Sequence, residues 1–339
     1  TTRDDGEAVD GSTYDADTVS GRLRLLPADG VVANLYARYA NTDSTSFPDQ
    51  SGGPEFAVLR SLDEASAEDY SIGGDVDWKF TDALSVQALA SHYRRDGEYA
   101  SPGIDPGDQV PPNGASNKLD RDNAALRLTA TGGMFTGTAG VDFQRESGDS
   151  EGYVVFGPDT IPNSFSLDRD ILGVFAEGRV QSGETWLVQA SVRHDDPDEV
   201  SGETTGRIGA AFSPNQGNTR FRADWGTGFK LPSFFALGSP IVGEPTLKPE
   251  KSESVEAGVI QRLGGRGEVA VTLFHYDFKD LIDLNPDTFR NINRDHVTSR
   301  GVEFGGSLAV TDTVGLRAHA TWTDLDVKGS DRQLLQRPD

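Results

Sequence analysis

Apolar and polar residues alternate with a period of two along most of the chain, and this is the period of half-buried β-strands. Within 314–323, for example, Leu316 and Ala318 alternate with Arg317 and His319. Helical periodicity is nowhere convincing. The sequence predicts an all-β chain of about fourteen strands. They are expected near 19–27, 31–42, 69–80, 84–95, 121–131, 134–146, 168–181, 185–195, 204–213, 218–228, 252–263, 267–280, 297–310 and 314–326.

The connections between these strands alternate strictly between short and long. The short ones are rich in Gly, Asp and Asn, which close tight hairpins. The long ones are rich in Asp, Pro, Ser and Gly, and lie around 43–68, 96–120, 147–167, 229–251 and 281–296. A soluble sandwich has no reason to place every long loop at one end, whereas an outer-membrane β-barrel has short periplasmic turns and long extracellular loops. The pattern therefore predicts a transmembrane antiparallel β-barrel.

Composition agrees with this class. Only 35% of the residues are hydrophobic and no cysteine is present. A barrel with one lipid-facing surface and a polar lumen has a low average hydropathy, whereas a soluble barrel would place its apolar surface inside. The formal net charge of −23 argues against a nucleic-acid partner, which needs a basic footprint. The lack of cysteine excludes disulfides, thiolate catalysis and Fe–S clusters.

Two stretches carry a family resemblance. Residues 222–233 are similar to the W-G-x-G-F-K-x-P segment of TonB-dependent outer-membrane receptors, and residues 243–252 resemble their G-N-P-x-L-K-P-E-x-S motif, with Glu244 in place of Asn. Shorter matches lie in family order before and after these stretches, at 174–177, 192–195, 291–293 and 301–303, so the resemblance covers roughly 170–339. The motif positions are Gly226, Gly228, Phe229, Lys230, Pro232, Pro245, Leu247, Pro249, Glu250, Gly301 and Glu303.

The resemblance implies a 22-stranded barrel preceded by a plug domain. Residues 1–339 are then expected to form part of the barrel domain, an interior fragment without the plug or the C-terminal strands. The implied function is active import of a scarce nutrient, such as an iron–siderophore or cobalamin, with no catalytic residue and no cofactor. The implied partners are the TonB energy-coupling complex through the plug, outer-membrane lipid and lipopolysaccharide, and an extracellular small molecule. The implied location is the outer membrane of a Gram-negative bacterium.

Candidate ligand-binding residues are Phe229 and Lys230, in the family segment, and His319, on the polar face of its strand. The segment that holds Phe229 and Lys230 is interpreted mainly as a structural device, because Pro232 lacks the N–H that would continue strand pairing. Acidic loop clusters at 15–17, 120–122 and 195–198 offer hard oxygen ligands for calcium, but none has EF-hand spacing, and a solvated acidic surface is favoured.

Two alternatives stay open from the sequence. The first is a complete fourteen-stranded passive porin or channel, since fourteen is an allowed even number of strands. The second is a secreted soluble β-protein that binds carbohydrate.

Overall fold

The computed structural model describes residues 11–48, 59, 61–104, 110–285 and 287–328. The described strands are β1 (Thr13–Ala28), β2 (Val31–Ser46), β3 (Asp63–Lys79), β4 (Leu84–Ser101), β5 (Asn113–Gly132), β6 (Phe135–Phe156), β7 (Asp159–Pro162), β8 (Phe165–Ser182), β9 (Trp186–Pro197), β10 (Glu203–Phe212), β11 (Thr219–Lys230), β12 (Glu250–Arg262), β13 (Gly267–Asn285), β14 (Arg290–Ala309) and β15 (Gly315–Val327). One short helix, α1 (Phe234–Gly238), lies between β11 and β12.

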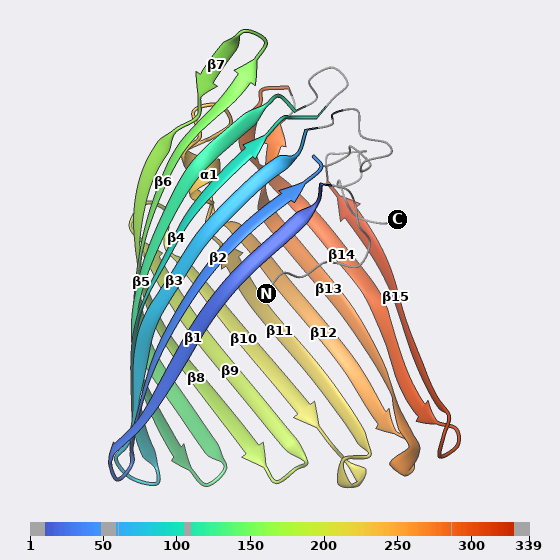
Figure 1. The fold of residues 1–339 in the computed structure, drawn as a ribbon. Coiled ribbons are helices and arrows are strands. Elements are labelled where there is room, and N and C mark those ends of the chain that lie inside the picture. The colour runs from blue at the N-terminus through green and yellow to red at the C-terminus, as the bar shows by residue number, and fades with distance from the viewer. Residues whose placement is uncertain (1–10, 49–58, 60, 105–109, 286, 329–339) are drawn as a thin grey trace.

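The strands form one antiparallel sheet in which neighbours follow chain order, and β7 alone lies off this path, paired with β6. The sheet curves into a tilted barrel wall with tight turns at one end and longer connections at the other (Figure 1). β1 and β15 stand at the two ends of the strand order. No helix among the described residues is long and apolar enough to cross a membrane. The all-β prediction and its fourteen wall strands are confirmed.

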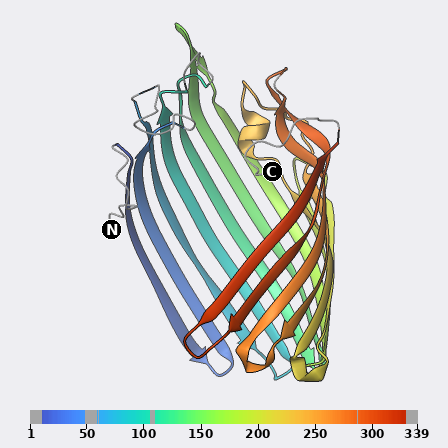
Figure 2. The ribbon, with the colours of Figure 1, turned by 90° about the vertical axis from the view of Figure 1, so that its right-hand side faces the viewer.

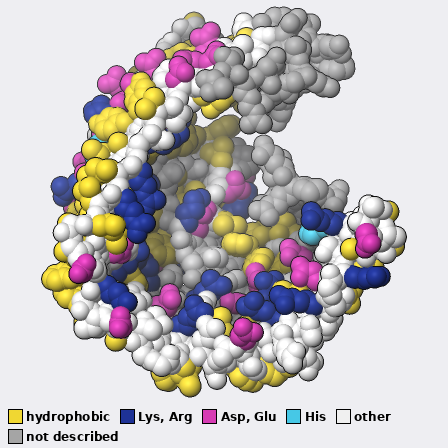
Figure 3. Space-filling view, turned by 60° about the horizontal axis from the view of Figure 1, so that its bottom comes forward, with side chains coloured by type: hydrophobic (Ala, Val, Ile, Leu, Met, Phe, Trp, Pro, Cys, Tyr) yellow, Lys and Arg dark blue, Asp and Glu magenta, His cyan; other side chains and the backbone are white. Residues whose placement is uncertain are grey.

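The strand register shows which side chains share each face of the wall. Leu23 lies directly beside Leu35, and Phe143 directly beside Leu172, so these side chains share the convex face, which we call the outer face. Leu35 is 52% exposed and Leu172 is 48% exposed. Figure 3 shows hydrophobic side chains around the convex rim, with charged side chains on the concave inner face. The wall therefore has apolar residues outside and polar residues inside, as an outer-membrane barrel requires.

Glycines on the inner face let charged side chains reach across a whole strand. Arg193 on β9 donates to Asp142 on β6 at 2.7 Å, passing over Gly173 on the intervening β8. In the same way Arg222 on β11 donates to Thr272 on β13 at 2.9 Å, beside Gly258 on β12. A Cβ at either glycine would meet the arginine side chain. The inner wall is thus cross-linked over three strands at a time.

The structure differs from the prediction mainly at the long-loop end. β3 begins at Asp63 and β6 runs to Phe156, so both strands extend well into segments predicted as loops. The reason is that backbone pairing continues above the apolar band, where polar side chains such as those of 113–120 replace the apolar alternation. The short strand β7 and the helix α1 also lie in predicted loops.

Candidate functional site

The connection between β11 and β12, residues 231–249, folds into the long-loop end of the barrel, and we call it the strap. Figure 2 shows α1 inside this opening, between the extension of β6 and β7 and the hairpin of β13 and β14. Ser233 caps the helix, because its Oγ accepts a hydrogen bond from the backbone N–H of Ala236 at 3.1 Å. Two sets of contacts hold the strap, one at each side.

The first set attaches the strap to the inner face of β6 and β8. Arg169 Nη1 donates to the carbonyl oxygen of Pro232 at 3.0 Å, and the ring of Phe234 lies 4.9 Å from the guanidinium carbon. Arg169 also pairs with Glu146 at 2.5 Å, and Arg121 donates to the same carboxylate at 2.8 Å. Glu146 is only 4% exposed. One buried carboxylate therefore holds the two arginines, and one of these holds the strap.

The second set attaches the strap to the hairpin of β13 and β14. Arg290 Nη1 donates to the carbonyl oxygen of Gly243 at 2.7 Å, and the backbone N–H of Asn291 donates to another strap carbonyl at 2.8 Å. The amide oxygen of Asn293 accepts from the backbone N–H of Lys248 at 2.9 Å. These bonds satisfy backbone groups that would otherwise be orphaned in a loop.

Three strap residues form a small apolar cluster with the neighbouring strands. Ala236, Leu237 and Leu247 are between 4% and 8% exposed, and Leu167 on β8 and Ile282 on β13 pack against them. The cluster joins the two sides of the opening through the strap. The strap is consequently an ordered part of the wall at this end.

Several family-motif residues hold the base of the strap. Lys230 and Glu250 face each other across β11 and β12 and form an ion pair of 3.1 Å. The second carboxylate oxygen of Glu250 accepts from the backbone N–H of Ile282 at 2.8 Å.

Pro232 and Pro249 are fully buried, and β11 ends at Lys230, two residues before Pro232. Pro245 is exposed near the centre of the strap, and Gly226 and Gly228 are half-buried on β11.

The contacts of Glu244 explain how the strap accommodates a glutamate where the family has an asparagine. Its Oε1 accepts from both the backbone N–H of Thr246 at 3.1 Å and the hydroxyl of Thr246 at 2.5 Å. An asparagine side-chain oxygen makes the same kind of turn. The two Thr246 bonds, hydroxyl first, hold the pKa of Glu244 below its ordinary value.

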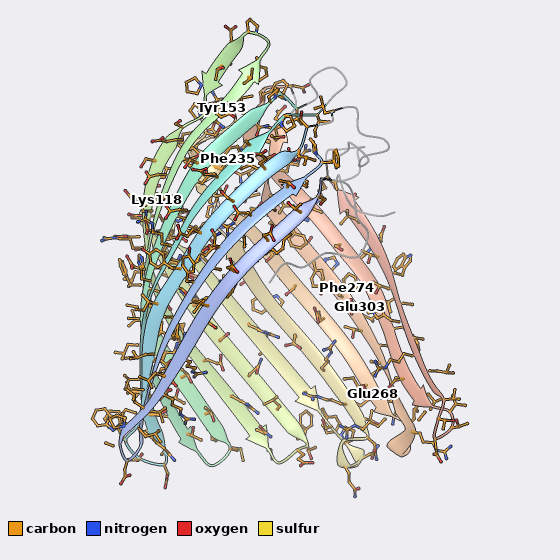
Figure 4. The ribbon with its side chains drawn as sticks, in the orientation of Figure 1. Lys118, Tyr153, Phe235, Glu268, Phe274 and Glu303 are labelled. Carbon is orange, nitrogen blue, oxygen red and sulfur yellow. The ribbon has the colours of Figure 1, made fainter. Side chains whose placement is uncertain are left out.

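Gly301 and Glu303 lie lower on the inner wall. The ring of Phe274 covers Gly301, and a Cβ there would lie 2.6 Å from the ring and would also meet the carbonyl oxygen of Trp322. Phe274 and Glu303 occupy the β13–β14 wall well below Phe235, which lies at the mouth (Figure 4). The motif glycine is thus the residue that lets an aromatic ring lie flat on the wall.

The three predicted ligand-binding residues do not come together. Phe229 lies directly beside Lys251 and shares the outer face with Trp225, whereas Lys230 is held by Glu250. His319 is exposed on β15, in the row that also contains Arg220 on the inner face. Their role in ligand binding stays a prediction.

In two of the acidic clusters that were considered for calcium, a carboxylate is engaged by another side chain. Asp122 lies 2.8 Å from His92 Nδ1, and Asp195, 4% exposed, is paired with Arg193. Across the part of the chain that the structure describes, no group of three or more His, Asp or Glu side chains is arranged to hold a metal ion. Calcium binding at these clusters stays untested.

Sequence reasoning missed the residues that fix the strap. Arg169 and Glu146 gave no motif signal, because their pairing depends on the register of β6 against β8, and the strap carbonyl that Arg169 binds lies 63 residues further along the chain. Asn291 and Asn293 belong to a segment that matched the family, although the match did not reveal that they hold the strap.

An apolar outer face, a charged inner wall and alternating turn lengths define a transmembrane β-barrel of the outer-membrane transport class. The chain belongs to the family of TonB dependent receptor-like β-barrels, whose model matches residues 3–339. It is accordingly located in the outer membrane of a Gram-negative bacterium, and its family consists of receptors and transporters and contains no enzymes. An outer-membrane location excludes the secreted soluble alternative.

Two curated relatives show the range of the family. The vitamin B12 transporter BtuB of Vibrio vulnificus (strain YJ016) is 28% identical over 203 residues, which cover 59% of this chain and 32% of that protein. The iron-regulated outer membrane virulence protein of Vibrio cholerae serotype O1 (strain ATCC 39315 / El Tor Inaba N16961) is 31% identical over 140 residues, covering 33% of this chain and 21% of that protein. The chain spans about a third or less of the length of these relatives.

Solved structures share the fold. The copper transporter OprC superposes with a TM-score of 0.76 at 15% identity, covering 96% of this chain and 55% of that one. The siderophore receptor PiuA from Acinetobacter baumannii gives 0.72 at 16% identity, covering 95% and 58%. At these identities the likeness concerns the fold alone.

Proposed function

We propose that this chain forms barrel wall and mouth of a receptor that imports a scarce nutrient, a metal chelate or a corrinoid, across the outer membrane with energy supplied through TonB. The observation that carries the proposal is the strap. Residues from β6, β8, β13 and β14 hold it inside the extracellular opening, where a passive channel needs free passage.

The named relatives support the substrate class, since they include a vitamin B12 transporter and an iron-regulated outer membrane protein. The charged inner wall supports the proposed lumen contacts with a polar plug domain. Outer-membrane lipid and lipopolysaccharide are the proposed partners of the outer face.

Energy coupling separates this proposal from a passive porin. Cells producing the natural protein that contains this chain would be given radiolabelled ferric chelates and radiolabelled cyanocobalamin at nanomolar concentration. We expect saturable accumulation of one class of label, abolished by deletion of TonB and by a protonophore. Accumulation that is linear in concentration and unaffected by either treatment would establish the passive channel instead.

A further inference from the structure

Two histidines, His275 and His296, share one carboxylate on the outer face of β13 and β14, where the apolar band gives way to charged side chains. Two residues before His275 on β13, Leu273 is 58% exposed, and Val255 on β12 lies directly beside His275. The next outward-facing position on β13 is Asp277. In an outer-membrane barrel such a transition marks the level of the lipid head groups.

Hydrogen bonds define this histidine cluster, which consists of His275, His296, Asp277 and Thr298. Nε2 of His296 lies 2.8 Å and Nε2 of His275 lies 3.2 Å from the carboxylate of Asp277, to which the Thr298 hydroxyl also donates at 2.9 Å. Because an ionised carboxylate can only accept, both Nε2 atoms carry the hydrogen of the neutral rings. Neither Nδ1 has a hydrogen bond to a residue in the described ranges. Nδ1 therefore takes the proton in acid and becomes a donor without a partner in the described protein.

Acid reverses the charge of the histidine cluster, because one carboxylate neutralises only one of two imidazolium rings. The cluster is net negative when both rings are neutral and net positive when both are protonated, and histidine is the side chain that changes charge between about pH 5 and pH 8. We propose that the protonated cluster binds a phosphate group of an outer-leaflet lipid, so that this part of the wall holds the lipid in acid and releases it at neutral pH. The inference rests on the proposed lipid partner of the outer face and is independent of the imported substrate.

The other charges around the cluster cancel. Among the described residues, six of these charged side chains form three ion pairs, which are Lys251 with Glu203, Arg300 with Asp324, and Arg294 with Asp283. The remaining four come from β12, β13, β15 and the residue after β15, and are Glu253, Lys279, Asp326 and Lys328. Two cations thus stand against two anions. The sign of the site is consequently set by the two histidine rings.

A cavity of about 220 Å³ beside the cluster offers room for a head group. Its lining includes Asp277, Thr227 and Lys279. Lys279 is exposed and has no ion pair within the described part of the chain, so its ammonium group is available to a phosphate oxygen. Trp225 Nε1 donates to Glu253 at 2.9 Å on the same face. Tryptophan is enriched at this level of membrane proteins, where one end of the ring is apolar and the other meets polar groups.

The other side of the barrel provides a matched contrast. His92 on β4 also lies on the outer face, in the same row as Ile72. Its Nδ1 lies 2.8 Å from Asp122, and its Nε2 lies 3.4 Å from the hydroxyl of Tyr70 and 3.9 Å from Asp120. One ring here has two carboxylates, and both of its nitrogens have partners. Protonation of His92 therefore leaves no surplus positive charge.

The test measures binding of diphosphoryl lipid A to the purified natural protein that contains this chain, in detergent, at about pH 7.5 and about pH 5.5, on either side of the ordinary histidine titration. The control probe is the same lipid without its phosphates, and the competitor is equimolar inorganic phosphate. The variants are His275→Gln, His296→Gln and Asp277→Asn, with His92→Gln as the matched control. Acid also lowers the charge of the lipid phosphate, equally for every variant, so each variant is compared with the wild type. Heat-modifiable mobility on gels verifies folding.

We expect the wild type to bind the phosphorylated lipid about fivefold more tightly at the lower pH, near the upper value for an exposed ion pair. His275→Gln and His296→Gln should each lose most of this increase, because Asp277 neutralises the ring that remains. Asp277→Asn should strengthen binding at both pH values. His92→Gln should behave as the wild type.

An increase that persists in both folded histidine variants would overturn the inference, and so would an equal increase with the dephosphorylated lipid or displacement of the lipid by inorganic phosphate. Absence of any increase in the wild type, alongside TonB-dependent accumulation of label by cells, would overturn the inference alone. The expected lipid binding together with TonB-independent accumulation would overturn the proposed function alone.

Discussion

The wall and the mouth of this barrel are built on different principles. In the wall each strand pairs with its neighbour in the chain, and Leu23 beside Leu35 is typical of contacts made within one hairpin. In the mouth the decisive contacts join Arg169 to Pro232, 63 residues apart, and Asn163 to Ser239, 76 residues apart. Local pairing makes a repeating wall, whereas long-range pairing makes a specific opening. Four experiments, all on the natural protein that contains this chain, test that contrast.

The largest effect is expected from Glu146→Gln. The substitution leaves Arg121 and Arg169 facing each other without their shared carboxylate, and breaking a buried ion pair in this way costs about 3–5 kcal/mol. We expect lower stability to urea and faster protease cleavage within the strap. The matched control is Asp170→Asn, which removes an exposed pair with Arg145 on the outer face and should cost about 0–1 kcal/mol. Equal losses from both variants would mean that the mouth has no special network.

The wall is tested by Val192→Lys on β9. Val192 is 53% exposed and shares the outer face with Ala176. A lysine facing lipid near the midplane costs about 2–4 kcal/mol. Ser191→Lys, one residue earlier on the inner face, should cost much less, because the lumen is polar. Folding titrations in lipid vesicles measure both, and similar costs on both faces would contradict the assignment of the lipid side.

The packing of rings on the inner wall is tested by Gly301→Ala. The new methyl would meet the ring of Phe274 and the carbonyl oxygen of Trp322, and overpacking of this kind costs about 1–3 kcal/mol. Gly305→Ala is the control, since it lies on the same strand and face with no atom within 4 Å of its added Cβ. Thermal unfolding followed by circular dichroism distinguishes the two. A loss from Gly305→Ala as large as that from Gly301→Ala would refute the steric explanation.

The smallest expected effect is a dependence of strap stability on pH. Because the pKa of Glu244 is lowered in the folded strap, its stabilising turn is present above the ordinary glutamate pKa and is lost as pH falls through the lowered value. Protease cleavage of the strap should therefore increase in acid. Glu244→Asn should keep the turn and remove this pH dependence, whereas Glu244→Ala should loosen the strap at every pH. An unaltered pH profile in Glu244→Asn would assign the titration to another group.

The sequence predictions were more accurate for the wall than for the mouth. The strand at 218–228 was expected from alternation alone, and β11 covers it with small shifts at each end. By contrast, 229–251 was expected as a long loop, and most of it forms an ordered strap with a helix and a buried cluster. Lys230 and Pro232 were interpreted mainly as a structural device, and the structure shows what they contact. The ligand-binding suggestion for Phe229, Lys230 and His319 was not resolved, because a binding site depends on residues that different strands bring together.

The sequence by itself determined that the chain is all-β, that its wall has one apolar and one polar face, and that turns of two lengths alternate. The first two properties follow from a period of two, which any strand must show when its two faces meet different surroundings. Only the tertiary structure decided that Glu146 joins Arg121 to Arg169, that Arg169 holds the strap at Pro232, and that Gly301 accommodates Phe274. The first and third contacts are set by strand register, which places these residues directly opposite one another on neighbouring strands. The second joins residues 63 apart in the chain, and it forms only because the strap folds back against the inner face of the curved wall.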